Sequence, residues 1–208
     1  VKTDSRPDFN LPNWKTAGVV IPVFSLRSTK SHGIGYFGDL RDMMAWVVKA
    51  GMHVIQILPI NDTTMTYTWQ DSYPYNSISI YAFNPIYCNL NALPAIKDKY
   101  QMERFMMKQQ ELNALRQVDY EAVMALKQDY LKQIYNQEGK EVMSTDDYKK
   151  FFEKNSDWLV PYAAFSYLRD TYKTADFRTW AKHSVYRKSE ITKLCSPDSK
   201  AYNDIALY

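Results

Sequence analysis

The residues best suited to chemistry lie in the segment 68–85, which reads TWQDSYPYNSISIYAFNP. Its stretch DSYPYN, residues 71–76, places a carboxylate, a hydroxyl, an amide and two tyrosine rings close together. Such polar groups hydrogen-bond to polyhydroxylated ligands, and a tyrosine ring packs against the apolar C–H faces of these ligands. Pro74 fixes its own φ and favours an extended Tyr73, which stiffens the pair of rings. The segment is typical of one wall of a sugar site, and a tyrosine-rich plug at a barrel rim is the alternative.

A glycine pattern elsewhere is similar to a nucleotide-binding fingerprint. Gly33, Gly35 and Gly38 fit G-x-G-x-x-G between a predicted strand and a predicted helix, and Asp62 follows near the position of the ribose-binding acid. Polar residues 27–32 separate the strand from the first glycine, however, where a phosphate-binding turn leaves almost no room. Gly38 is also expected to precede the helix. We interpret the pattern as a glycine-rich loop without a nucleotide, and a nucleotide-binding α/β domain remains an alternative.

The histidines and cysteines show no spacing that favours a metal or redox site. His32, His53 and His183 are scattered, and Cys88 lies far from Cys195 in the sequence. The sequence contains no nucleophile elbow, no P-loop and no H-E-x-x-H pattern. We therefore expect no metal, no cofactor, and two structural thiols in a reducing compartment.

Two strands and a helix are predicted to precede the tyrosine-rich segment. Residues 18–26 and 53–60 are almost continuously apolar, as in strands that are covered on both faces. The amphipathic stretch 39–51 predicts a helix between them, with Asp39 capping its start and Gly51 its end. Such a βαβ unit has parallel strands joined by a right-handed crossover. The tyrosine-rich segment then follows the carboxyl end of the second strand, where α/β folds bind ligands.

The rest of the chain has a helical pattern. Apolar residues recur at helical spacing in residues 120–135 and again in residues 158–172. Ser144 and Asp147 have the spacing of a capping box, which predicts the start of another helix. No third buried strand is recognisable, so the sequence predicts two strands followed by a helical half.

The composition describes an ordinary globular protein. Hydrophobic residues make up 46% of the 208 residues and charged residues 24%, which suffices for a sizeable core. The net charge of +3 argues against nucleic acid or an anionic membrane surface as a partner. The first residues are polar, and no apolar run reaches the roughly 18 residues that a spanning helix needs. We expect neither a signal peptide nor a membrane span, and a cytoplasmic location.

Five segments together resemble the 4-α-glucanotransferases, the amylomaltase or disproportionating-enzyme family of glycoside hydrolases. They occur in the family's order and read GVVIPVFSL, GIGYFGDL, HVIQILPIND, WQDSYPYNSISIYAFNP and VDYEAVMALK. The likeness is densest over residues 18–90 and thinner through the helices up to residue 175. Tyr73, inserted between Ser72 and Pro74, departs from the shorter D-S-P-Y form and is similar to the branch that carries N-terminal starch-binding modules.

The resemblance implies a fold, a reaction and a set of site residues. It implies an α/β fold, the N-terminal part of a (β/α)8 barrel followed by a helical insertion, and transfer of α-1,4-glucan between maltodextrin or glycogen-like chains. Carried over by motif, Asp71, Ser72 and Tyr75 line the donor sugar sites, with Tyr75 stacking on the sugar at the cleavage point. The implied division is a linker leading to the first strand, the first strands with the substrate loop, and a mainly helical insertion, at 1–17, 18–90 and 91–208.

The family's nucleophile and acid/base lie on later strands, so the resemblance implies no catalytic residue within this chain. A closed barrel needs about 250 residues, so we expect this chain to be an N-terminal piece of a longer enzyme and to be inactive alone. Its open strand edges are expected to be covered by dimerisation, by swapping or by its own helices. A non-catalytic carbohydrate-binding or interaction module is the alternative from another functional class.

Overall fold

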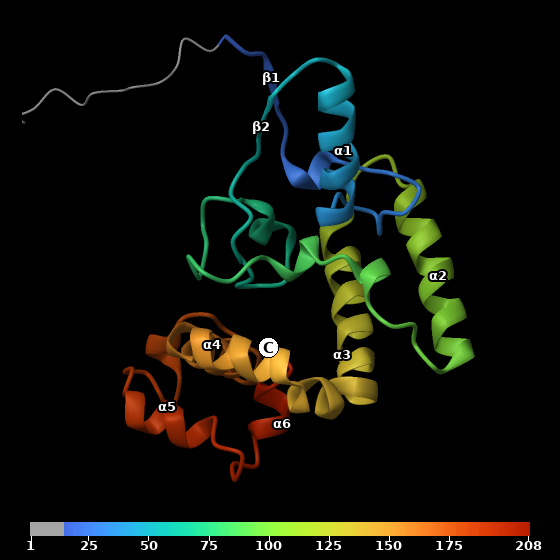
Figure 1. Ribbon diagram of the computed structural model, residues 1–208. Coiled ribbons are helices and arrows are strands. Elements are labelled where there is room, and N and C mark those ends of the chain that lie inside the picture. Colours follow the sequence, from blue (N-terminus) through green and yellow to red (C-terminus); the bar gives the residue numbers. More distant parts are fainter. Residues whose placement is uncertain (1–14) are drawn as a thin grey trace, which may run out of the picture.

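Residues 15–208 are described by a computed structural model, in which helices outweigh strands (Figure 1). Residues 1–14, which make up most of the predicted linker 1–17, lie outside the described residues. No helix in residues 15–208 is both long and apolar enough to cross a bilayer. The strands and helices are β1 (Gly18–Val20), α1 (Phe37–Lys49), β2 (Val54–Gln56), α2 (Lys99–Ala114), α3 (Tyr120–Ser144), α4 (Asp146–Tyr172), α5 (Lys188–Leu194) and α6 (Tyr202–Ile205).

The two strands pair in parallel, with Val19 opposite Ile55, which confirms the predicted parallel arrangement. Each strand has only three residues, far fewer than the predicted strands 18–26 and 53–60. The prediction that both faces are covered is also wrong, because Val20 is 66% exposed. β1 and β2 form a sheet of two strands in the described part of the chain, so no further strand covers their outer edges.

α1 joins the strands, but its start differs from the prediction. The helix begins at Phe37 with Tyr36 as the N-cap residue, and Asp39 helps to cap it from the first turn by accepting the Tyr36 N–H at 3.3 Å. The Asp39 carboxylate accepts hydrogen bonds from the hydroxyls of Ser28 and Ser31, both at 2.6 Å, and ties the preceding loop to the helix. Gly51 follows the helix with φ of +71°, which confirms its predicted place at the C-terminal end.

α3 runs from the strand-bearing end of the molecule to α4 and connects these two parts (Figure 1). Val123 and Met124 on α3 pack into the main core with Ile86. Lys127, one turn further along, is fully buried, and its Nζ donates to the carbonyls of Ile86 and Cys88. Burial lowers the pKa of Lys127 to about 8. α3 therefore holds the backbone just after the tyrosine-rich segment.

α4 is one continuous helix that packs against both α3 and the C-terminal helices. The predicted capping box at Ser144 and Asp147 is displaced by one residue, because Thr145 caps the helix through a bond from the Tyr148 N–H. α4 continues past Pro161 to its C-terminal end. One face of α4 contacts the loop that follows β2, through Tyr162 and Arg169.

Candidate sugar site

The chain between β2 and α2 begins with a closed loop. The Asp62 N–H donates to the Ala82 carbonyl at 2.9 Å, and the Ile78 N–H donates to the Asp62 carbonyl at 2.7 Å. We call residues 62–71 the anchor segment and residues 72–83 the aromatic segment. The loop lies between the strands and α4 (Figure 1). Its two segments differ in burial and in bonding.

Asp71 ends the anchor segment and fixes its shape. It is 5% exposed, and its Oδ2 accepts the backbone N–H groups of Met65, Thr66 and Tyr67 at 3.1, 2.9 and 2.7 Å. Its Oδ1 accepts the Thr66 hydroxyl at 3.0 Å. A carboxylate that accepts several N–H groups stabilises a tight turn, so Asp71 holds the backbone of the loop in place. Direct contact between this carboxylate and a sugar stays a prediction.

Asp62 begins the anchor segment and joins it to α4. Its Oδ1 accepts the Thr64 N–H at 2.9 Å and the Thr64 hydroxyl at 2.6 Å, and its Oδ2 accepts the Tyr162 hydroxyl at 2.7 Å. Burial, followed by the Asp62 charge, raises the pKa of Tyr162, which keeps the phenol protonated as a donor. Both buried acids of the loop are therefore engaged in internal hydrogen bonds.

The glycine pattern packs against protein atoms. A Cβ on Gly35 would lie 1.9 Å from the Val23 carbonyl oxygen, and a Cβ on Gly33 would lie 2.9 Å from the Leu112 side chain. Gly38 lies inside α1, so the expectation that it precedes the helix is wrong. The first two glycines serve close packing of the loop, which supports the interpretation without a nucleotide.

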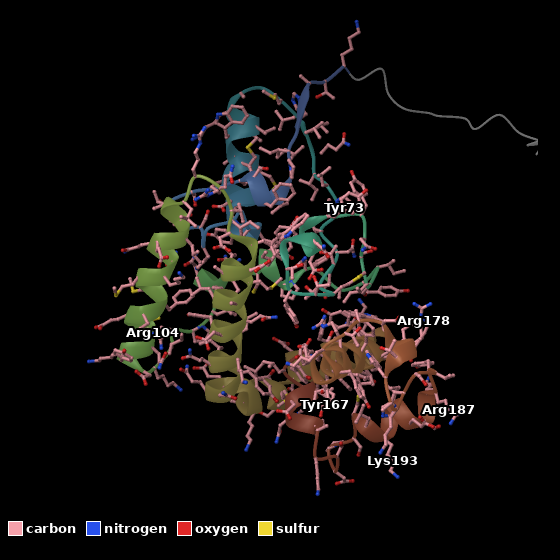
Figure 2. The ribbon with its side chains drawn as sticks, turned by 180° about the vertical axis from the view of Figure 1, so that it is seen from behind. Tyr73, Arg104, Tyr167, Arg178, Arg187 and Lys193 are labelled. Carbon is pink, nitrogen blue, oxygen red and sulfur yellow. The ribbon has the colours of Figure 1, made fainter. Side chains whose placement is uncertain are left out.

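The aromatic segment presents rings to solvent. Tyr75 is 62% exposed, and its ring centroid lies 5.5 Å from that of Tyr73 at an interplanar angle of 54°. Ser72, next to them, is exposed. Figure 2 shows Tyr73 on the side of the loop away from the helical part that carries Arg178. The Tyr75 ring is thus available to pack on a ligand.

A cavity of about 260 Å³ adjoins the loop. Asp71 and Ser72 line it, whereas Tyr75, on the same loop, is exposed and is not among its lining residues. Sequence reasoning missed two further lining residues, the exposed Trp69 and Tyr120 at the start of α3. The Tyr120 hydroxyl is buried and forms no hydrogen bond of normal geometry in the structure. The sequence signal that could have identified Tyr120 was its position in VDYEAVMALK, next to Asp119, which caps α3.

A family model described as 4-alpha-glucanotransferase matches residues 21–208. The chain belongs to the 4-alpha-glucanotransferase family. It is 36% identical over 200 residues to 4-alpha-glucanotransferase DPE2 of Oryza sativa subsp. japonica, a match that covers 94% of this chain and 20% of that protein. It is also 37% identical over 177 residues to the 4-alpha-glucanotransferase of Chlamydia caviae, which covers 82% of this chain and 32% of that protein. The chain thus spans between a fifth and a third of the length of these two relatives.

Within this member of the 4-alpha-glucanotransferase family, the loop offers binding groups and no free reactive acid. Asp62 and Asp71 each accept at least three hydrogen bonds, which leaves neither placed as a nucleophile or proton donor. No group of three or more His, Cys, Asp or Glu residues in the described part of the chain could hold a metal ion. The arrangement can bind a polyhydroxylated ligand through rings and hydroxyls held on a rigid turn.

Proposed function

We propose that this chain forms one wall of the donor-glucan site of a retaining 4-alpha-glucanotransferase, which transfers α-1,4-glucan segments between maltodextrins. The observation that carries the proposal is the exposed Tyr73–Tyr75 pair on a loop held by buried hydrogen bonds, in a chain that belongs to this family. A rigid aromatic platform binds the apolar face of a sugar with little loss of conformational entropy.

Four residues have distinct roles in the proposed site. The Tyr75 ring stacks on a glucosyl unit, and the Ser72 hydroxyl, which is exposed beside it, hydrogen-bonds to a sugar hydroxyl. Asp71 acts chiefly by holding the turn, because its carboxylate already accepts four hydrogen bonds. Trp69, exposed at the cavity, extends the apolar surface toward a neighbouring glucosyl unit.

The reactive carboxylates are proposed to lie outside residues 1–208. Retaining transfer uses two carboxyl groups about 5 Å apart, one as nucleophile and one as acid and base. Because the buried acids of the loop are engaged in its own hydrogen bonds, the chemistry needs other acids. We place β1 and β2 as the first strands of a (β/α)8 barrel, with the helices of residues 91–208 as an insertion. The exposed edges of β1 and β2 support this placement.

Calorimetric titration of the 208-residue chain with maltoheptaose tests the proposal, with cellohexaose as the β-1,4-linked control. We expect saturable binding of maltoheptaose, weaker binding of cellohexaose, and no glucose release from maltotriose. Equal binding of both oligosaccharides would contradict an α-1,4-glucan site. Glucose release by the chain would contradict the placement of the reactive acids elsewhere. Binding of α-glucan by a full-length protein that shows no transfer would favour a non-catalytic carbohydrate-binding module.

A further inference from the structure

Two consecutive residues near the end of α4 contact the anchor segment. Arg169 is 3% exposed, and its Nη1 donates to the Thr64 carbonyl at 2.7 Å while its Nη2 donates to the Tyr67 hydroxyl. Its Nε donates to Asp170 Oδ1 at 2.7 Å, and the guanidinium lies 4.8 Å from the centroid of the Tyr67 ring. Asp170 Oδ2 accepts the Tyr67 hydroxyl at 2.8 Å and also the Tyr208 hydroxyl. Both residues therefore converge on Tyr67.

Tyr67 has a backbone conformation that an L-residue with a large side chain rarely adopts. Its φ is +59°, in the left-handed region, which is unfavourable for a residue other than glycine. Such a conformation persists only where neighbouring groups hold it. Asp71 holds the Tyr67 N–H from within the loop, at 2.7 Å. Arg169 and Asp170 hold the Tyr67 side chain from α4.

The conformation of Tyr67 decides where the aromatic segment starts. The next residue, Thr68, caps the short 3-10 helix Trp69–Ser72 by accepting the Gln70 N–H. This helix leads directly into Tyr73. A change in the backbone at Tyr67 would therefore redirect the helix and the rings that follow it.

We propose that Arg169 and Asp170 are positioning residues that fix the aromatic segment for glucan binding by holding Tyr67 in its left-handed conformation. The inference rests on the proposed function and adds a role for α4 in that site. The rings then require less ordering when a glucan binds, because the loop is already in its binding conformation. Arginine suits the task because its planar fork reaches three acceptors in different directions, which the single ammonium of lysine does not.

The protonation state of Tyr67 fits this arrangement. Burial, as the largest cause, raises the pKa of Tyr67, so the phenol keeps its proton and donates it to Asp170. The phenol oxygen remains free to accept the Arg169 Nη2–H. Tyr67→Phe keeps the ring beneath the guanidinium and removes only the hydroxyl, which isolates these two bonds.

The chain contains a matched control for the Arg169–Asp170 pair. Arg178 and Asp176 form an ion pair with the same 2.7 Å distance between Nε and Oδ1, yet the Arg178 side chain is 77% exposed. Figure 2 shows Arg178 on the helical part of the molecule that also carries Arg187 and Lys193. Arg178→Lys therefore removes a guanidinium from an ion pair without disturbing the loop.

The test compares Arg169→Lys, Tyr67→Phe and Arg178→Lys in the 208-residue chain at a temperature where each variant is folded. Hydrogen exchange of the amides in residues 65–72 and the Kd for maltoheptaose are measured. We expect Arg169→Lys to speed exchange in this stretch at least tenfold and to weaken maltoheptaose at least fivefold, with α3 amides unchanged. Tyr67→Phe should have a smaller effect. The double variant should lose less than the sum of the two single effects, because both substitutions remove the Arg169–Tyr67 bond, whereas the Tyr67–Asp170 bond is lost only through Tyr67→Phe. Arg178→Lys should behave as the wild type.

Several results would overturn the inference. Unchanged exchange in residues 65–72 would show that α4 does not hold the loop, whether or not glucan binds. A lower melting temperature in Arg169→Lys with a Kd within twofold of the wild type would reduce the pair to a purely structural role. Tyr75→Ala separates the two proposals, because an unchanged Kd in that variant contradicts the proposed function itself. Weakened binding in Tyr75→Ala together with unchanged binding in Arg169→Lys contradicts only the positioning role.

Discussion

The anchor segment and the aromatic segment belong to one loop, yet they reverse the usual distribution of polar and apolar side chains. Asp62, Thr63, Thr64 and Asp71 of the anchor segment are buried, whereas the aromatic segment exposes Tyr75 and other large side chains. Buried polar groups must be hydrogen-bonded, and exposed rings in a group are typical of a binding surface. The comparison shows one stretch that, apart from the exposed Trp69, determines the shape of the loop and a second that is free to meet a ligand.

The strongest test of this division is Asp71→Ala, which leaves three backbone N–H groups in the anchor segment without their acceptor. A hydrogen bond to a charged acceptor contributes about 1.5–3 kcal/mol, and three such bonds are lost at partly buried donors, so we expect the unfolding free energy to fall by about 3 kcal/mol or more. Denaturant unfolding measures the change, with the exposed Asp42→Ala on α1 as the control. A loss below about 1 kcal/mol would show that Asp71 does not hold the turn.

Acidic pH should lower stability through a buried histidine outside the loop. It should not change the exposure of the tyrosine rings of the aromatic segment. Burial, assisted by the charge of Lys127, lowers the pKa of His32 to about 4, and neither ring nitrogen has a hydrogen-bond partner. The unfolded chain therefore binds a proton that the folded chain excludes, and stability falls as the pH drops from about 6.5 to about 4, by up to roughly 3 kcal/mol. His32→Leu should flatten this part of the pH profile of the melting temperature.

The exposed His53→Gln variant is the control for this profile. Maltoheptaose affinity of the folded chain at pH 5.5 should match that at pH 7. A wild-type slope in His32→Leu would mean that other groups cause the acid destabilisation. If affinity fell before any folded protein was lost, the rings would depend on the rest of the structure. That result would contradict the division of the loop into two segments.

A smaller effect is expected where the anchor segment meets α4 through Asp62. Tyr162→Phe removes the hydroxyl that donates to Asp62 at 2.7 Å, while the two bonds from Thr64 remain. We expect a loss of about 1.5–3 kcal/mol in denaturant unfolding, the range for one bond to a charged acceptor. Tyr167→Phe on the same helix is the control. Equal losses in the two variants would show that the Asp62 bond has no special weight.

Local sequence predicts the helices better than the strands. α3 and α4 satisfy their backbone groups within themselves and carry their own capping signals, so pattern and spacing locate their starts. The pattern did not predict α2, it ended α3 too early, and it divided α4 into two helices. β1 and β2 depend on neighbouring strands for pairing and cover. Their apolar sequences therefore predicted long buried strands, where the structure has short exposed ones.

The types of residue in the candidate site were predictable, but the contacts that hold them in place were not. The ring and hydroxyl content of residues 71–76 was compatible with a sugar-binding wall and with a plug at a barrel rim, and the family resemblance favoured the wall. Sugar binding by these residues stays a prediction. The contacts that hold the loop join residues far apart in sequence, such as Arg169 and Thr64, which are 105 positions apart. No local pattern predicts such a pair, because it depends on how α4 packs against the loop.

The central claim is that Tyr75 is exposed because it binds glucan and not because the loop lacks cover. Tyr75→Ala in the 208-residue chain, titrated calorimetrically with maltoheptaose, tests this most directly. We expect the unfolding free energy to stay within about 0.5 kcal/mol of the wild type, as for other exposed positions, and the affinity to fall about tenfold, or 1.4 kcal/mol. An unchanged Kd in a stably folded Tyr75→Ala chain would contradict the claim.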